Sequence, residues 1–169
     1  MTDEEYDRAA EHWTSGEAET ARMPEDELRT ELDGFLAAHN TCALACGAGD
    51  FVRCTPLEYA WRDGAFWIFS EGGLKFRALK ENKNVSLAVF EPYDGFGTLA
   101  SAQVTGVAEV VDPESPAFVE AVAAKGLPAA ALPKLKGALN LIRIAPSRID
   151  YLSSALKARG YGTRQWIEL

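Results

Sequence analysis

The chain has 169 residues, of which 47% are hydrophobic and 25% are charged, and its formal net charge is −8 at pH 7. This length suits one domain with a substantial core, and the composition is that of an ordinary soluble globular protein. Residues 1–33 carry 12 acidic and 3 basic residues, so the acidity belongs to the N-terminal segment. Because no basic stripe offsets that segment, we exclude nucleic acid binding. No apolar run is long enough to span a bilayer and the N-terminus has no signal-peptide pattern, so we expect a cytoplasmic protein without a membrane partner.

The three cysteines, Cys42, Cys46 and Cys54, lie inside apolar, strand-like runs. Their odd number and their setting favour buried, reduced thiols over a disulfide framework. A metal site would need further ligands, and the available histidines, His12 and His39, lie in helical patterns remote from the cysteines. We therefore predict no metal site. We also expect both histidines to lie away from the strands and the tail, which disfavours haem.

Two helices are predicted before the first strand. Apolar residues recur at helical spacing over residues 3–15 and end at Trp13, which we expect to dock onto the body or onto a partner subunit. This acidic helical segment, residues 1–23, precedes the main part of a single domain. Pro24 then opens a second helix, since a proline at a helix start loses no hydrogen bond. The apolar stripe of that helix predicts a core-facing surface formed by Leu28, Leu32, Phe35 and Leu36.

The remainder of the chain alternates mainly between strands and turns. Strands are predicted over residues 41–46, 51–61, 65–70, 85–90 and 99–111, followed by a last strand, 139–144 and 148–152, bent at Pro146. Asp63-Gly64 is a strong hairpin signal. Helices are predicted over residues 74–82, 114–125 and 128–136, and the tail from Ser153 shows no clear period. This order predicts a mostly β (α+β), mostly antiparallel architecture, for which a small barrel is the economical closure.

Residues 66–79 combine a buried strand, a turn with two adjacent glycines and a helix with basic residues in its first turn. This arrangement suits a phosphate, because a helix N-terminus presents free N–H groups and glycine lets an anion approach the backbone. Ser70 can donate its hydroxyl, and Lys75 and Arg77 can supply charge. The alternative is an ordinary strand-to-helix turn with a lysine on a solvated face.

Arg53 and Thr55 share one face of a predicted strand, next to Pro56. A proline cannot donate to a sheet ladder, which indicates an edge, a bulge or a point of ligand approach. The alternative is an arginine at the sheet margin that pairs with Glu58 or Asp63. No G-x-S-x-G elbow or H-E-x-x-H motif is present, so an enzymatic activity would rely on a cofactor.

Several of these segments together resemble the pyridoxamine 5′-phosphate oxidase-like family of flavin-binding split barrels. The resemblance rests on Arg53-Cys54-Thr55-Pro56-Leu57 and on residues 63–70, 74–85 and 103–109, and it extends over residues 28–152. It implies a six-stranded antiparallel split β-barrel with flanking helices. It also implies a homodimer that binds two FMN molecules at the subunit interface.

The resemblance implies a set of cofactor-binding residues. The flavin ring and the start of the ribityl chain would be lined by Arg53, Cys54, Thr55 and Pro56. Gln103 would reach the flavin from the later strand, in the same or the other subunit.

The remaining predicted residues lie toward the phosphate. Phe69 and Ser70 would follow the ribityl chain, and Leu74 and Lys75 occupy the positions where relatives place a basic pair. Leu74 replaces an arginine of that pair, which leaves Lys75 as the main charge. No catalytic residue is assigned.

The function implied is that of an FMN-dependent oxidoreductase that acts on a small molecule by hydride transfer through the flavin N5 atom. Residues 101–103 and the tail, residues 162–166, depart from the true oxidase, so we do not expect pyridoxamine phosphate oxidation. The alternatives are a deazaflavin-dependent reductase, a non-catalytic flavin or haem binder, and an interaction domain with an empty barrel.

Overall fold

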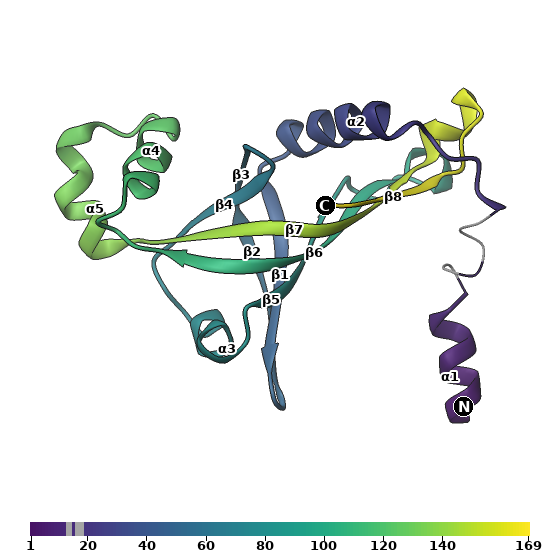
Figure 1. The fold of residues 1–169 in the computed structure, drawn as a ribbon, viewed down its shortest axis with the longest axis horizontal. Helices are drawn as coiled ribbons and strands as arrows, with labels where there is room; N and C mark the ends of the chain where they lie inside the picture. The colour runs from purple at the N-terminus through teal and green to yellow at the C-terminus, as the bar shows by residue number, and fades with distance from the viewer. Residues whose placement is uncertain (13–14, 16–18) are drawn as a thin grey trace.

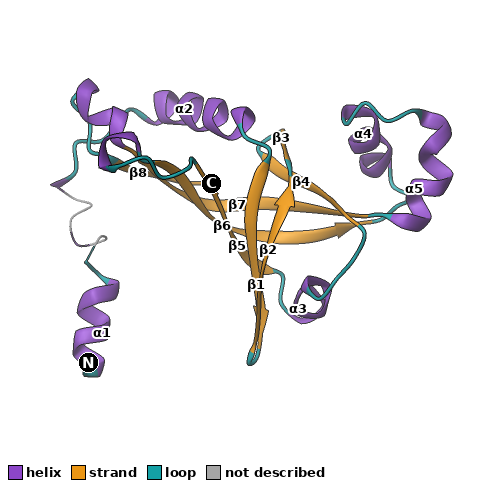
Figure 2. Ribbon diagram, turned by 180° about the vertical axis from the view of Figure 1, so that it is seen from behind, coloured by secondary structure: helices purple, strands orange, loops and turns teal. Residues whose placement is uncertain are grey.

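A computed structural model describes residues 1–12, 15 and 19–169. The strands form one antiparallel sheet in the order β2-β1-β5-β6-β7-β4-β3, and β8 pairs with β7 outside this path (Figures 1 and 2). The strands are β1 (Thr41–Ala48), β2 (Phe51–Glu58), β3 (Ala60–Arg62), β4 (Ala65–Ser70), β5 (Asn84–Phe90), β6 (Ala100–Val111), β7 (Asn140–Ser153) and β8 (Arg164–Glu168). The helices are α1 (Asp3–Ala10), α2 (Glu25–Ala38), α3 (Lys75–Glu81), α4 (Pro116–Ala124) and α5 (Leu132–Ala138).

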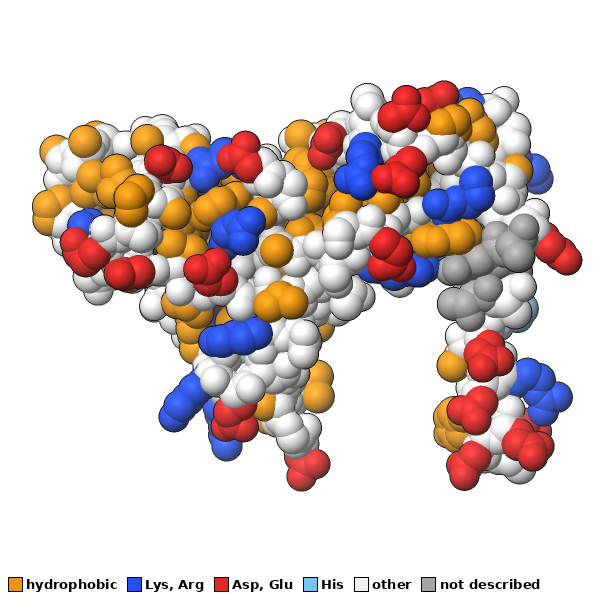
Figure 3. Space-filling view, in the orientation of Figure 1, with side chains coloured by type: hydrophobic (Ala, Val, Ile, Leu, Met, Phe, Trp, Pro, Cys, Tyr) orange, Lys and Arg blue, Asp and Glu red, His pale blue; other side chains and the backbone are white. Residues whose placement is uncertain are grey.

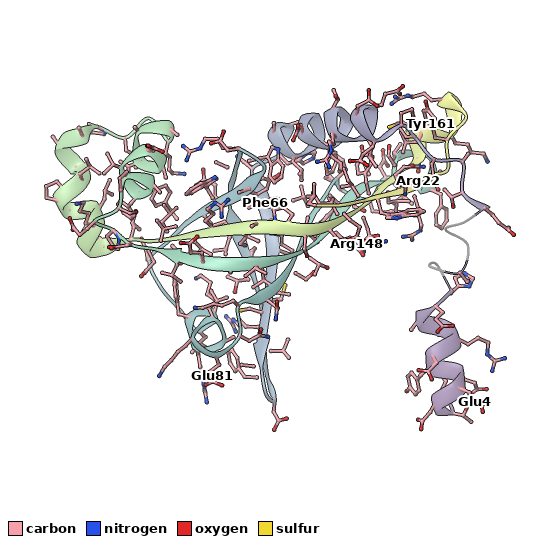
Figure 4. The ribbon with its side chains drawn as sticks, viewed as in Figure 1. Glu4, Arg22, Phe66, Glu81, Arg148 and Tyr161 are labelled. Carbon is pink, nitrogen blue, oxygen red and sulfur yellow. The ribbon has the colours of Figure 1, made fainter. Side chains whose placement is uncertain are left out.

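The sheet curls around a hydrophobic core, and α2 lies along one side of it (Figure 1). Leu28, Leu32 and Leu36 of α2 are buried against the sheet, as their helical spacing predicts. Phe66, labelled on β4 in Figure 4, is fully buried in the same core. The predicted α+β class and the curled antiparallel split-barrel architecture with flanking helices are confirmed.

The number of strands differs from the six expected. The predicted strand 51–61 divides at Tyr59, whose hydroxyl donates a hydrogen bond to Leu36 O at 2.7 Å and whose N–H donates to Asn40 O at 2.8 Å. Tyr59 therefore bonds to α2 and to the residue before β1, which separates β2 from β3.

The second difference is β8 in the tail, where no periodicity was recognised. Its Gln165 is only 1% exposed and makes three hydrogen bonds: it accepts from Met23 N–H at 2.9 Å and donates to Ala21 O at 3.1 Å and Gly162 O at 2.8 Å. The guanidinium of Arg22 lies 3.6 Å above the Trp166 ring, and Figure 4 labels Arg22 beside this strand. The tail is thus fixed by contacts with residues that precede α2, which a local pattern cannot reveal.

The last long strand, which we expected to be broken or bent at Pro146, is not broken. β7 runs through the proline, and its pairing with β6 shifts between Thr105 and Gly106. A Cβ atom on Gly106 would lie 2.6 Å from Ala145 O, so glycine is required where the two backbones approach. Ser147 has no register partner in β6, so β7 carries an irregularity directly after Pro146, at the position where the bend was expected.

Two parts of the chain lie outside the barrel. Helices α4 and α5 form a lobe with its own small core, which includes Phe118 and Leu141, and hydrophobic side chains gather on the surface of this lobe in Figure 3. Helix α1 contains no buried residue and ends at Ala10. The expected docking of Trp13 falls outside the described residues. Within the described part of the chain, no helix is long and apolar enough to cross a membrane.

Candidate functional site

The turn between β4 and α3 has a fixed, glycine-dependent conformation. Gly72 and Gly73 have φ angles of 137° and 106°, a region that side chains with a Cβ rarely adopt. Ser70 is buried, and its hydroxyl accepts from Gly72 N–H at 3.2 Å and lies 3.1 Å from Gly72 O, to which it donates. Asn140 on β7 donates to Ser70 O at 3.2 Å. The sequence singled out Ser70 and the glycines, whereas Asn140 was missed because its partner lies 70 positions away.

Lys75 carries the charge of this turn. Its side chain is only 4% exposed, and its ammonium donates a hydrogen bond to Gly72 O. Burial lowers the pKa of Lys75, the Cys46 sulfur opposes that shift and the Arg53 charge adds to it. No ion pair with a carboxylate is found for Lys75 among the described residues. The turn therefore contains a buried cation without an anionic partner, which is the electrostatic requirement of an anion site.

Arg53 approaches the same region from edge strand β2. The pairing of β2 with β1 places Arg53 opposite Cys46 and Thr55 opposite Leu44, so both side chains lie on the face of the sheet that carries the core. Cys46, which pairs with Arg53, has its Sγ 3.7 Å from Lys75 O, so Arg53 and Lys75 belong to the same region. The alternative interpretation, in which Arg53 pairs with Glu58 or Asp63, is wrong.

Those two acids have other basic partners. Glu58 Oε2 lies 2.8 Å from Lys125 Nζ, and Asp63 Oδ2 lies 3.1 Å from Arg62 Nε. Arg77, the other predicted charge, is exposed and lies 5.3 Å from the centre of the Phe51 ring.

Three predicted residues lie on the opposite face of the sheet. Cys54 and Pro56 alternate with Arg53 and Thr55, and Gln103 on β6 is exposed on that outer face. The strand register places Pro56 and Gln103 in one row, in which Pro56 pairs with Ala43, Ala43 with Ala88, and Ala88 with Gln103. Within one chain, Gln103 and Lys75 are therefore on opposite faces of the sheet.

The two remaining predicted residues flank the turn. The Phe69 side chain also points outward and contacts α4, with its ring 5.9 Å from that of Phe118. Leu74 is 56% exposed at the start of α3. One end of the barrel thus collects Arg53, Ser70 and Lys75, whereas the side chains of Phe69 and Gln103 point elsewhere.

The three cysteines differ in solvent exposure, whereas we expected all three to be buried. Cys42 and Cys46 are buried as predicted, but Cys54 is exposed because the outer face of edge strand β2 is uncovered in the single chain. Burial raises the pKa of Cys42 to about 12 and also raises that of Cys46. Cys46 lies next to the candidate site, with Sγ 3.7 Å from Lys75 O, a neighbour that only the strand register could have identified.

Our expectation that both histidines lie away from the strands and the tail is wrong. His39 Nε2 lies 3.0 Å from Glu91 Oε1, directly after β5, and its Nδ1 lies 2.7 Å from Phe35 O. His12 lines a pocket of about 740 Å³ that also includes Gln103 and Trp166. The sequence separation of the histidines from the strands did not predict their distance in space.

Comparisons with known proteins identify the family. A family profile described as pyridoxamine 5′-phosphate oxidase matches residues 28–153. No curated protein sequence matches the chain.

Solved structures share the fold at low sequence identity. A conserved hypothetical protein from Mycobacterium tuberculosis aligns with a TM-score of 0.64 and 21% identity over 82% of this chain and 89% of that one. An FAD-binding protein from Mesorhizobium loti aligns with a TM-score of 0.57 and 22% identity over 72% of this chain and 89% of that one. A haem storage protein from Vibrio cholerae aligns with a TM-score of 0.58 and 18% identity over 69% of this chain and 88% of that one. From the profile match, which spans most of its length, we conclude that this chain belongs to the pyridoxamine 5′-phosphate oxidase family.

Proposed function

We propose that the protein binds FMN and that the turn between β4 and α3 holds the phosphate. The observation that carries this proposal is Lys75, a buried ammonium without a carboxylate partner in the described chain, fixed beside two glycines. A phosphate dianion would offset the desolvation of this charge and accept hydrogen bonds from it. Arg53 supplies a second charge from β2, in place of the arginine that Leu74 replaces. The FAD-binding neighbour supports a flavin as the ligand.

We further propose a homodimer with the flavin at the subunit interface. The outer face of β1 and β5 presents small side chains, Ala43, Ala45, Ser86 and Ala88, between Pro56 and Gln103. Small residues allow a second sheet to approach closely, so this face suits a second copy of the chain. In such a dimer Gln103 would contact the flavin bound by the partner, which is consistent with its position on the face opposite Lys75.

The activity that this arrangement supports best is oxidation or reduction of a small molecule. Bound FMN would accept or donate a hydride at its ring. The chain would contribute the phosphate contacts of Lys75 and Arg53, which fix the position of the cofactor. The interface would exclude water from the reacting face of the ring.

The absorption spectrum of the freshly purified protein tests the cofactor directly. We expect the two visible bands of an oxidised flavin, and FMN added to apoprotein should restore them. A Soret band would instead identify a haem protein, and a colourless protein that does not bind added FMN would refute the proposal. Parallel titrations with FMN and a deazaflavin separate the two cofactor classes.

Lys75→Ala tests the position of the phosphate. We expect FMN affinity to fall by about 1.5–3 kcal/mol, the size of a charge-assisted contact, and riboflavin affinity to change much less. Lys80→Ala is the matched control, because Lys80 is an exposed lysine on the same helix. Equal losses for FMN and riboflavin would mean that Lys75 has a structural role.

Enzymatic activity is tested by anaerobic reduction of the bound flavin with NADH, NADPH or a chemical donor. An enzyme should pass these electrons to an added small-molecule acceptor with turnover. Flavin that stays bound but cannot be reduced productively would identify a carrier.

A further inference from the structure

A pocket lies between α3 and the hairpin that joins β1 to β2, which Figure 1 shows side by side. Asn82, directly after α3, donates a hydrogen bond to Gly47 O at 2.9 Å, which holds the helix and the hairpin together. We call this space the hairpin pocket. It has a volume of about 370 Å³ and is lined by Ala48, Asp50, Phe51, Arg77 and Glu81, of which Figure 4 labels Glu81. Pockets of roughly 300–1,000 Å³ hold drug-sized ligands, so the hairpin pocket can accept a group of nucleoside size.

The hairpin pocket is adjacent to the proposed phosphate site along β2. Alternation along this strand places Phe51, Arg53 and Thr55 on one face. In the proposed FMN site the cofactor runs along this face from Thr55 to the phosphate contacts of Arg53 and Lys75. Phe51 therefore lies beyond the phosphate end of FMN, on the side where a group attached to the phosphate would extend.

The charged side chains around this pocket are not paired with one another. Arg77 and Glu81 are four residues apart on α3, a spacing that permits an ion pair on a helix, but none forms. Within the described residues, Asp50 and Arg53 form no ion pair either. All four side chains are exposed, so a ligand can reach them without breaking an existing contact between charges.

The lining combines three kinds of group that together suit an adenosine phosphate. The guanidinium of Arg77 lies 5.3 Å from the centre of the Phe51 ring, and a guanidinium matches the geometry of a phosphate. The half-buried Phe51 ring offers a surface on which a base can stack. The carboxylates of Asp50 and Glu81 can accept hydrogen bonds from ribose hydroxyls and from the amino group of adenine.

We propose that the hairpin pocket binds the adenosine monophosphate half of FAD, so that the cofactor site accepts FAD as well as FMN. The first phosphate occupies the turn at Lys75, and the second phosphate contacts Arg77 and Arg53. The adenine ring packs on Phe51. This inference rests on the proposed FMN site, because the two phosphates of FAD are directly joined.

Calorimetric titration of the apoprotein with FMN and with FAD tests the proposal. We expect FAD to bind at least about tenfold more tightly than FMN, because FAD adds a charge-assisted contact and a stacked base. AMP titrated into the FMN-loaded protein should bind at least about a hundredfold more weakly than FAD binds the apoprotein. The reason is that only FAD presents its adenosine group at the high effective concentration of a tethered ligand.

Substitutions in the hairpin pocket should separate the two cofactors. Arg77→Gln should lower FAD affinity about tenfold and leave FMN affinity nearly unchanged, because FMN has no second phosphate. Lys80→Gln removes a positive charge from the same helix outside the pocket and should change neither affinity. Phe51→Leu keeps an apolar side chain but loses the stacking surface, so FAD affinity alone should fall at least about fivefold. Lys75→Met should weaken FMN and FAD alike, since they share the first phosphate.

The proposal is overturned if FAD binds no more tightly than FMN, or if folded Arg77→Gln and Phe51→Leu variants keep the full preference for FAD. Equal losses for FMN and FAD in these variants would mean a structural role and would also overturn it. AMP that binds the FMN-loaded protein as tightly as FAD binds the apoprotein would assign the pocket to a free nucleotide instead. Circular dichroism and thermal melting establish that each variant is folded.

The two titrations also separate this inference from the proposed function. A protein that binds neither FMN nor FAD would refute the proposed function. A protein that binds FMN without preferring FAD would refute only the role of the hairpin pocket.

Discussion

Two buried polar side chains, Gln165 on β8 and Lys75 on α3, contrast sharply. Both are less than 5% exposed. The amide of Gln165 makes three hydrogen bonds to backbone groups, and these connect the tail to the segment before α2. The ammonium of Lys75 donates to one carbonyl, and no carboxylate pairs with it in the described structure.

The difference separates a structural role from a binding role. A buried polar group whose bonds are satisfied within the chain holds segments together and specifies the fold. A buried charge without a counter-charge lowers stability, and it is retained where a ligand supplies the missing partner. We therefore assign Gln165 to the fold and propose that Lys75 binds the cofactor, and substitutions can break or sharpen this distinction.

The largest effect should come from Gln165→Leu. The variant leaves Met23 N–H, Ala21 O and Gly162 O without their partner, which should lower the free energy of unfolding by about 3 kcal/mol. For a chain of this length the melting temperature should then fall by about 6–12 °C. Glu168→Gln on the same strand is the control. It removes an exposed ion pair with Arg148 and should cost less than about 1 kcal/mol. A Gln165→Leu variant as stable as this control would contradict the structural role.

Lys75→Met should have the opposite sign in the protein without cofactor. Methionine retains the length of the side chain and removes the desolvated charge, so the apoprotein should gain about 1 kcal/mol and melt about 2–4 °C higher. FMN affinity should fall at least tenfold in the same variant. The measurements are thermal melts of apoprotein and fluorescence titrations with FMN. Destabilised apoprotein would show that Lys75 is a structural residue like Gln165.

The contrast also explains which features the sequence could predict. Ser70, the adjacent glycines and Lys75 lie within six residues of one another, so the proposed anion site was visible as a local pattern. The strand division at Tyr59 and the position of β8 depend on hydrogen bonds to α2 and to residues 21–23, which no local period encodes. The family resemblance placed Phe69 near the cofactor from its position in the sequence. The alternation of side chains along β4 shows instead that its ring faces α4.

Arg53→Gln should have a smaller effect than Lys75→Met. Arg53 is exposed, so its contact with a phosphate is screened by water and salt, and we expect FMN affinity to fall about three- to tenfold. The loss should shrink as ionic strength rises. Arg29→Gln, which removes an exposed arginine of α2, is the matched control and should leave FMN binding unchanged. An effect of Arg53→Gln that is the same for riboflavin would place Arg53 away from the phosphate.

The smallest effect is a pH dependence of FMN binding that Lys75 should produce. Burial lowers the pKa of Lys75 from its usual 10.5, and bound phosphate would raise it again because the anion favours the charged form. Above the lowered pKa of the apoprotein, Lys75 must take up a proton when FMN binds. FMN affinity should therefore fall with rising pH, in a window that begins below 10.5. Ionisation of the flavin ring is common to FMN and riboflavin, so the ratio of their dissociation constants isolates the lysine. That ratio should change with pH in the original protein and stay constant in Lys75→Met, whereas an equal slope in both would mean that another group controls the phosphate contact.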